Sequence, residues 1–265
     1  MDFSYPLSPD PDEAQSPVVG WHHDSVEAKI FPPHRHRRAQ LMHVTSGIVV
    51  VEVENGRWVV PPVRALWIPA GITHSARYPR GVAMRHLYLE MSTFEQEMPA
   101  HCALLQLDGL TKELIKAVAE QPWEAGLSGP GARLIAVLID RLAQSARSDL
   151  YLPTGQDRRV RRVMDALMQD PSDQRSLREI AKNASASERT LARLFKDDTG
   201  LTFGDWRQQL RLHLAIERLA SGDSIAQVAF DLGYGSPSSF TTMFRKALGV
   251  PPARYIKGAS ADGLA

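Results

Sequence analysis

The stretch SLREIAKNASASERTLARLF, residues 176–195, decides how the second half of this chain folds. Ser176 with Glu179 matches the capping box, in which a hydroxyl and a carboxylate satisfy the first backbone N–H groups of a helix. The same spacing recurs at Ser185 and Glu188. Two helix starts this close together exclude one long helix. The stretch therefore predicts two short helices joined by a turn.

Apolar residues in this stretch recur at helical spacing, which gives the helix pair an inner face. Ala181 lies where the two helices would cross, and its small side chain lets the backbones approach. An ordinary pair of core helices would show the same inner face. The inner face consists of Leu177, Ile180, Leu191, Leu194 and Phe195, and the outer face of Glu188, Arg189, Ala192 and Arg193.

A second stretch, SIAQVAFDLGYGSPSSFTTMF at residues 224–244, repeats the pattern. Ser224 begins another capping box, and Ser236 followed by Pro237 marks the start of the next helix. The turn is one residue longer, and Gly233 suits it because glycine adopts positive φ freely. Two such units in one small domain predict two recognition helices.

Two further helices should frame these units. The first, from about residue 158, has arginines outside and an apolar stripe inside; the second, from Thr202 to Gly222, joins the two units. Residues 157–258 hold 17 Lys and Arg against 12 Asp and Glu, whereas residues 1–156 hold 14 against 17. The positive excess suits a polyanionic partner, although a solvated helical surface has the same composition.

From Leu177 to Tyr255 the sequence resembles the AraC/XylS family of transcription factors. The resemblance implies a homodimeric, ligand-responsive regulator that binds double-stranded DNA and a small-molecule effector, with RNA polymerase as a further partner. The residues that carry the resemblance are Ile180, Ala181, Leu191, Leu194, Phe195, Thr199, Gly200, Ala215, Leu219, Ile225, Val228, Ala229, Gly233, Tyr234, Phe240, Phe244, Gly249, Pro252 and Tyr255.

Carried over by position, the resemblance assigns DNA contacts to both recognition helices. Arginine can bond a guanine edge through two hydrogen bonds, for about 1–3 kcal/mol of discrimination, whereas Ser and Thr hydroxyls read bases less selectively. We therefore expect the first helix to dominate specificity. The first helix offers Arg189, Ala192 and Arg193, and the second offers Ser238, Ser239, Thr241 and Thr242.

The first half of the chain has a different composition. Residues 1–17 hold four prolines and few apolar residues, which predicts a flexible arm. The N-terminus has no apolar leader, no later apolar run approaches a membrane span, and Cys102 is the single cysteine, so no internal disulfide can form. These features favour a soluble cytoplasmic protein with no membrane partner.

Short β-like runs separated by turns extend from Val18 to Glu90 and predict an all-β barrel or jelly roll. The clearest is VVVEVENGRWVV at residues 49–60, where Asn55 and Gly56 are expected as the central pair of a type I′ hairpin turn.

After this unit, residues 111–121 and 130–147 are amphipathic and predict helices. The second helix has an apolar stripe of Leu134, Ile135, Leu138 and Leu142. It either covers the barrel or supplies part of a dimer surface.

Three histidines and a glutamine within the β unit form a candidate metal site. Residues two apart in a strand share a face, so we expect His34, His36 and Gln40 to point inward, with His74 on a neighbouring strand. Here the sequence resembles the cupin family, whose first motif is HxH, three residues, Glu, six residues, Gly, and whose second contains PxGxxH. The matching residues are His34, His36, Gln40, Gly47, Pro69, Gly71 and His74, with Gln40 in place of the usual carboxylate and with Val63 and Tyr78 departing from the flanks of the second motif.

Three imidazoles suit zinc, nickel or ferrous iron, and a neutral amide is a weaker ligand than a carboxylate. Alternatively, the histidines line a polar effector pocket without a metal. A cupin-like sensor ahead of an AraC-type domain is also a usual arrangement in that family, so the two resemblances support each other.

These observations predict an α+β protein with an N-terminal all-β cupin-like barrel, flanking helices, and a C-terminal all-α domain with two helix-turn-helix units. The expected division is a flexible arm at 1–17, an effector and dimerisation domain at 18–150, a linker at 151–157 around Pro153 and Gly155, and a DNA-binding domain at 158–258.

The leading function is sequence-specific regulation of transcription, without enzyme activity. Two alternatives remain: a metal-dependent cupin enzyme with an accessory helical domain, and a barrel that serves only as a dimerisation module. Two capped helix-turn-helix units argue against the enzyme, and Gln40 in place of a carboxylate weakens a catalytic metal site.

Overall fold

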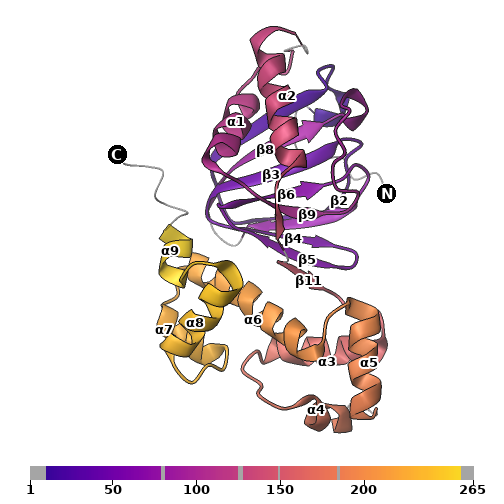
Figure 1. Cartoon of the computed structure of the whole chain (residues 1–265), viewed down its shortest axis with the longest axis vertical. Coiled ribbons are helices and arrows are strands. Elements are labelled where there is room, and N and C mark those ends of the chain that lie inside the picture. Colours follow the sequence, from indigo (N-terminus) through magenta and orange to yellow (C-terminus); the bar gives the residue numbers. More distant parts are fainter. Residues whose placement is uncertain (1–9, 79–80, 125–127, 149, 184–185, 258–265) are drawn as a thin grey trace. The chain divides into compact units, whose positions relative to one another are not determined.

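The chain divides into two units (Figure 1). The first is built on β-strands with two helices against one sheet, and the second is helical apart from a short β ribbon. The first unit is Met1–Val53 with Val60–Asp149, and the second is Glu54–Val59 with Leu150–Ala265. The computed structural model describes residues 10–78, 81–124, 128–148, 150–183 and 186–257. Among these residues, no helix has the length and hydropathy that crossing a bilayer would require.

The larger sheet has six antiparallel strands in the order β1-β8-β3-β6-β9-β10. Its central strands are buried along nearly their whole length because helices cover one face and the other faces the interior between the sheets. The strands are β1 (Val18–Val26), β3 (Ala39–Ser46), β6 (Arg64–Ile68), β8 (Val82–Leu89), β9 (Ala103–Gln106) and β10 (Arg147–Ser148).

Helices α1 (Gly109–Ala119) and α2 (Gly129–Ala143) lie against this sheet and share one apolar cluster with it (Figure 1). Three members of the predicted stripe on α2 are buried there: Ile135, Leu138 and Leu142. The fourth, Leu134, is 37% exposed, and its neighbour Val137 is 45% exposed. The helix therefore covers the sheet with one face and keeps a small apolar strip outside.

The second sheet has the order β11-β5-β4-β7-β2. The hairpin at residues 49–60 is present, but its turn lies at Glu54 and Asn55, one residue earlier than predicted, and Gly56 begins β5. A Cβ on Gly56 would lie 2.5 Å from the carbonyl oxygen of Leu152, so the glycine is needed for a close strand approach. The strands are β2 (Lys29–His34), β4 (Val49–Val53), β5 (Gly56–Val60), β7 (His74–Tyr78) and β11 (Tyr151–Pro153).

The expected flexible arm is wrong for residues 10–17, while residues 1–9 lie outside the described chain. A 3-10 helix, η1 (Pro11–Glu13), is held because the Asp12 carboxylate accepts the backbone N–H groups of Arg37 and Arg38 at 2.8 and 3.2 Å. The Arg38 guanidinium also donates to the carbonyl of Ser16 at 2.6 Å. Composition missed this because the ordering partners lie more than twenty residues away in the sequence.

The expected linker at 151–157 contains strand β11. Leu152 is only 2% exposed and belongs to the helical core, and the indole Nε1 of Trp206 donates to the carbonyl of Pro153 at 2.8 Å. The Pro and Gly content of this stretch is typical of a linker, but its first residues are ordered and pack against the helical core.

The helical unit contains both predicted helix pairs and the long helix that joins them. The cap of the fifth helix is Ser187, whose hydroxyl accepts the N–H of Thr190 at 3.1 Å; the predicted cap, Ser185, lies outside the described residues. The helices are α3 (Arg158–Gln169), α4 (Leu177–Asn183), α5 (Glu188–Thr199), α6 (Phe203–Ala220), α7 (Ile225–Asp231), α8 (Pro237–Leu248) and α9 (Pro252–Lys257).

Candidate functional site

The first helix pair is built as the sequence indicates. The Glu179 carboxylate accepts the backbone N–H of Ser176 at 2.7 Å, which completes the capping box of α4. Ala181 and Leu191 are buried between α4 and α5, and Gly200 ends α5 with φ of 73°. A left-handed residue at that position stops the helix, so α5 presents a face of fixed length.

The second helix pair repeats this frame with different residues. Ser224 caps α7, and Ser236 caps α8 ahead of Pro237, as predicted. Ala229 is fully buried in the position of Ala181, and Gly249 ends α8 with φ of 81°. Both recognition helices therefore start and stop by local signals that the sequence carries.

The predicted DNA-contacting residues lie on the outer faces of α5 and α8. Thr241 is half-buried, and the hydroxyl of Ser239 donates to the backbone carbonyl of Ser236, which ties it to the helix cap. Arg193 forms an ion pair with Asp197, one turn further along α5, at 3.0 Å. Bound DNA would compete with Asp197 for the Arg193 guanidinium. The exposed residues are Arg189, Ala192, Arg193, Ser238, Ser239 and Thr242. Their contact with DNA remains a prediction.

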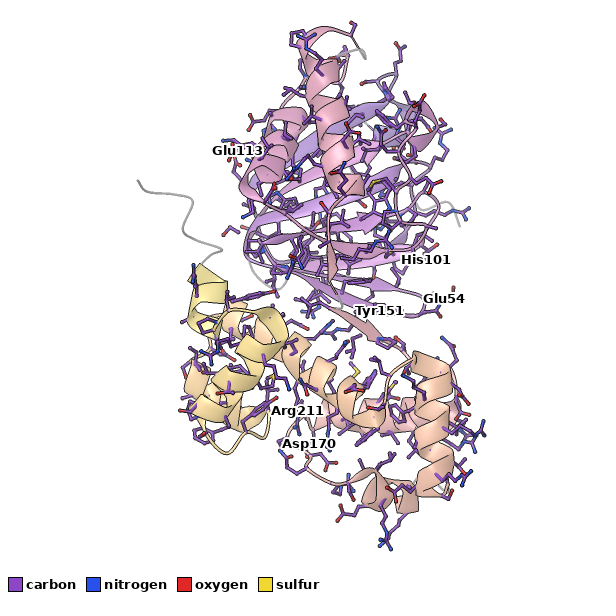
Figure 2. The ribbon with its side chains drawn as sticks, viewed as in Figure 1. Glu54, His101, Glu113, Tyr151, Asp170 and Arg211 are labelled. Atoms are coloured by element: carbon purple, nitrogen blue, oxygen red, sulfur yellow. The ribbon has the colours of Figure 1, made fainter. Side chains whose placement is uncertain are left out.

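One residue that sequence reasoning missed connects the two helix pairs. Arg211 of α6 is buried; its guanidinium donates to the carbonyls of Pro171 and Asp173 at 2.9 and 3.0 Å. The same group lies 5.8 Å from the ring centroid of Tyr234, in the turn of the second pair. Figure 2 shows Arg211 beside the loop that begins at Asp170. The signal in the sequence was an arginine at an inner position of an amphipathic helix.

The three predicted histidines form one cluster in the β unit. His34 ends β2 and pairs in register with His74 of β7, so their rings lie 4.4 Å apart between centroids. His36 does not continue the strand; it lies in the connection to β3, and its ring is 5.1 Å from that of His34. The candidate ligand atoms of all three lie within 4.8 Å of one another.

Hydrogen bonds to backbone carbonyls determine which ring nitrogen of His34 and of His74 would bind a metal. Nδ1 of His34 and Nδ1 of His74 face the carbonyls of Pro32 and Ile72 at 2.8 and 3.0 Å. A proton on Nδ1 leaves the lone pair on Nε2, and a backbone carbonyl behind a histidine is a common second partner in metal sites. Nε2 of His74 is buried and has no hydrogen-bond partner among the described residues.

Burial keeps these imidazoles neutral. Desolvation lowers the pKa of His36 to about 3 and the pKa of His74 to about 4, and it also lowers the pKa of His34. Neutral imidazole is the form that binds metals, so all three rings are ready to act as ligands at neutral pH.

Gln40 is buried on β3 of the opposite sheet. Its amide nitrogen lies 3.0 Å from Nδ1 of His86 and donates to the hydroxyl of Tyr88 at 3.2 Å, while its Oε1 is buried without a partner among the described residues. His86 and Tyr88 were not among the residues predicted from the sequence. Alternation along β8 carried the signal, because Met84, His86 and Tyr88 fall two residues apart on one face.

These residues fit a divalent cation. Nitrogens bound to one zinc ion at about 2.0–2.1 Å would lie roughly 3.4 Å apart in tetrahedral geometry, so ligand atoms that lie within 4.8 Å of one another would have to move together by about 1.4 Å at most. Zinc, nickel and ferrous iron all accept imidazole ligands. The amide oxygen of Gln40 supplies a neutral donor at most, and its place as a ligand remains a prediction.

Two family descriptions match consecutive parts of the chain: an AraC-like ligand binding domain over residues 21–179 and a helix-turn-helix domain over residues 180–258. The transcriptional regulator NimR of Escherichia coli is 37% identical over 234 residues, which cover 88% of this chain and 85% of that protein. The regulator RipA of Corynebacterium glutamicum is 37% identical over 43% of this chain and 34% of its own length.

Among solved structures, ToxT from Vibrio cholerae covers 90% of this chain and 97% of its own, at 12% identity and a TM-score of 0.38. The extent of the ligand-binding-domain match and the identity with NimR establish the family. The chain belongs to the AraC-type transcription regulators, with a ligand-binding domain followed by a DNA-binding helix-turn-helix domain.

Proposed function

We propose that this regulator recognises its DNA site with both recognition helices of each chain, acts as a homodimer in the cytoplasm, and changes its DNA affinity when a small molecule occupies the β unit. RNA polymerase is a further partner in this proposal. The function is regulation, and no catalytic step is assigned to the β unit.

The observation that carries the proposal is the pair of matching helix-turn-helix units on one continuous helix. The 18 residues of α6 span about 27 Å at 1.5 Å per residue. Successive major-groove faces on one side of B-DNA are about 34–36 Å apart, so two recognition helices joined by α6 can reach neighbouring groove segments.

Genome-wide mapping of bound sites supplies the operator for the first test. Fluorescence anisotropy with that operator should then show that the double variant Arg189→Ala, Arg193→Ala binds at least about tenfold more weakly than the wild type, because two arginine contacts are lost. Arg133→Ala, which removes an exposed arginine of α2, is the matched control. Equal affinities for the two variants would refute the proposal for α5.

Dimerisation through the outer strip of α2 has its own test. Leu134 and Val137 are exposed side by side in helical spacing, and an aspartate in such a strip would oppose association. Sedimentation velocity should show Val137→Asp shifted towards monomer, with Met168→Asp on α3, also at an exposed apolar residue, unchanged. A dimer that survives Val137→Asp would exclude this surface.

We also propose that His34, His36 and His74 hold one divalent metal ion, whose charge and ligation would lock the β2 and β7 ends together. Metal analysis of protein expressed in medium supplemented with zinc, nickel and iron should give close to one ion per chain. His36→Ala should lose the ion, whereas His101→Ala, at an exposed histidine that Figure 2 labels, should keep it. Wild-type protein without metal would refute this second proposal and leave the first untouched.

A further inference from the structure

A groove on the outer edge of the β unit takes no part in the proposed DNA or metal sites. It lies between β1, an edge strand of the larger sheet, and the C-terminal end of α1, and its volume is about 880 Å³. Pockets for drug-sized ligands range from roughly 300 to 1,000 Å³, so a small organic molecule has enough room. The wall residues that matter most are Trp21, Trp123, Glu120 and Glu124.

Two indole rings meet beside this strand edge. Nε1 of Trp123 donates to the carbonyl of Gly20 at 2.8 Å, which an edge strand leaves available. Its ring meets that of Trp21 edge to face, with centroids 5.5 Å apart and an interplanar angle of 85°. The ring of His23 stacks on Trp21 at 5.8 Å. Both indoles are half-buried, so each is fixed and still presents aromatic surface.

The groove is also negative. A Cβ on Gly20 would lie 2.3 Å from Cα of Ala119, so the absent side chain lets the last turn of α1 press against β1. That turn brings the partial negative charge of a helix C-terminus to the groove. Glu120 and Glu124 add two exposed carboxylates, and none of the described wall residues is Lys or Arg.

We propose that this groove binds an organic cation, such as a quaternary ammonium compound with an aromatic or alkyl body. A cation over an indole face gains about 0.5–2 kcal/mol, and indole is the best of the aromatic rings for this contact. The carboxylates and the α1 terminus favour the same charge, whereas an anion would meet repulsion. A neutral apolar ligand would gain from the rings but not from the charges.

Isothermal titration of the full-length protein with benzyltrimethylammonium tests the proposal, with benzyl alcohol and phenylacetate as neutral and anionic comparisons. The cation should bind with a Kd between about 10 µM and 1 mM, as expected for a ligand of this size. The neutral compound should bind at least about tenfold more weakly and the anion weaker still, since both lose the cation–π contact. Equal affinity for all three, or no binding of the cation, would overturn the proposal.

Variants place the binding in this groove. Trp123→Ala should weaken cation binding by about tenfold or more, and the double variant Glu120→Gln, Glu124→Gln by about threefold to tenfold, since it removes charge and keeps shape. Glu113→Gln is the matched control, because Glu113 is an exposed glutamate on the outer side of α1 outside the groove (Figure 2). If Trp123→Ala fails to fold, the double variant decides; affinities within twofold of wild type there would overturn the proposal.

Discussion

The two helix-turn-helix units share a frame and differ in what they present. Each pairs a helix of 7 residues with a recognition helix of 12, and each recognition helix runs from a serine cap to a left-handed glycine. On α5 the exposed face carries Arg189 and Arg193, whereas the exposed start of α8 carries Ser238 and Thr242. The residues that start, stop and pack each recognition helix are therefore different from those on its exposed face, and either set can be changed alone.

The frames also differ inside. Phe195 of the first unit packs against Phe203 and Trp206, with ring centroids 5.5 and 6.2 Å away, in a core shared with α3 and α6. In the second unit, Phe240 and Phe244 continue a row of rings from Tyr234 to Tyr255, with neighbouring centroids 5.3 to 5.7 Å apart.

The largest expected effect follows from removing these rings. Phe195→Ala and Phe240→Ala should each lower the free energy of unfolding by about 3–5 kcal/mol, because each empties a fully buried aromatic site. Urea unfolding followed by far-UV circular dichroism measures this. Phe230→Ala, at a residue of α7 that is 56% exposed, should stay within about 0.5 kcal/mol of wild type. A loss below about 1 kcal/mol for either buried ring would show that its unit tolerates a cavity.

A smaller effect separates Gly200 from Gly233, which are two of the glycines in left-handed conformations. Gly233→Ala should cost about 3 kcal/mol, because φ is 80° and the new Cβ would lie 2.7 Å from the carbonyl of Ser172. Gly200→Ala, with φ of 73° and open space around it, should cost about 1–2 kcal/mol. The same unfolding experiment compares them. Equal losses would mean that the close approach of Gly233 to Ser172, in the loop between α3 and α4, adds nothing to the cost of the substitution.

Acid should lower the stability of the helical domain through α6, the helix that joins the two helix-turn-helix units. His213 of α6 is fully buried, and desolvation lowers its pKa to about 3 from an ordinary 6.5. The unfolded chain therefore takes up a proton below pH 6.5 that the folded chain refuses, and stability falls as the pH drops from 6.5 towards 3, by up to about 1.4 kcal/mol per pH unit.

Between pH 7 and pH 5, wild-type protein should lose about 2 kcal/mol more than His213→Gln, which has no proton to gain. Urea titrations at both pH values give the difference, and His101→Gln, at an exposed histidine, is the control. A parallel loss in wild type and His213→Gln would assign acid sensitivity to the buried histidines of the β unit instead.

Local signals in the sequence were enough to find the helix pairs. The caps at Ser224, Ser236 and Thr202 are where the capping patterns indicated, because each hydroxyl accepts an N–H only three residues away. For α5 the pattern pointed to Ser185, which lies outside the described residues, whereas Ser187 supplies the cap and accepts the N–H of Thr190.

Contacts between distant segments explain what the sequence did not reveal. In the sequence Leu152 has the surroundings of a linker residue. In the structure the Trp206 indole, more than fifty residues later in the chain, donates to the carbonyl of the neighbouring Pro153 and orders this segment. The histidine motif predicted which residues would meet but placed His36 in a strand, whereas the chain turns from one sheet to the other there. Trp123 and Arg211 gave no motif at all, because their roles depend on which strand or loop lies beside them.

We expect α5 to read bases selectively and α8 to contact DNA phosphates more than base edges. This division of roles can be measured by binding-site selection with Arg193→Ala and with Thr242→Ala over a series of salt concentrations. Arg193→Ala should relax specificity at a subset of base positions by about 1–3 kcal/mol, while Thr242→Ala should leave the selected motif unchanged and weaken binding to all sites alike. A motif altered by Thr242→Ala and untouched by Arg193→Ala would contradict it and make α8 the main reader.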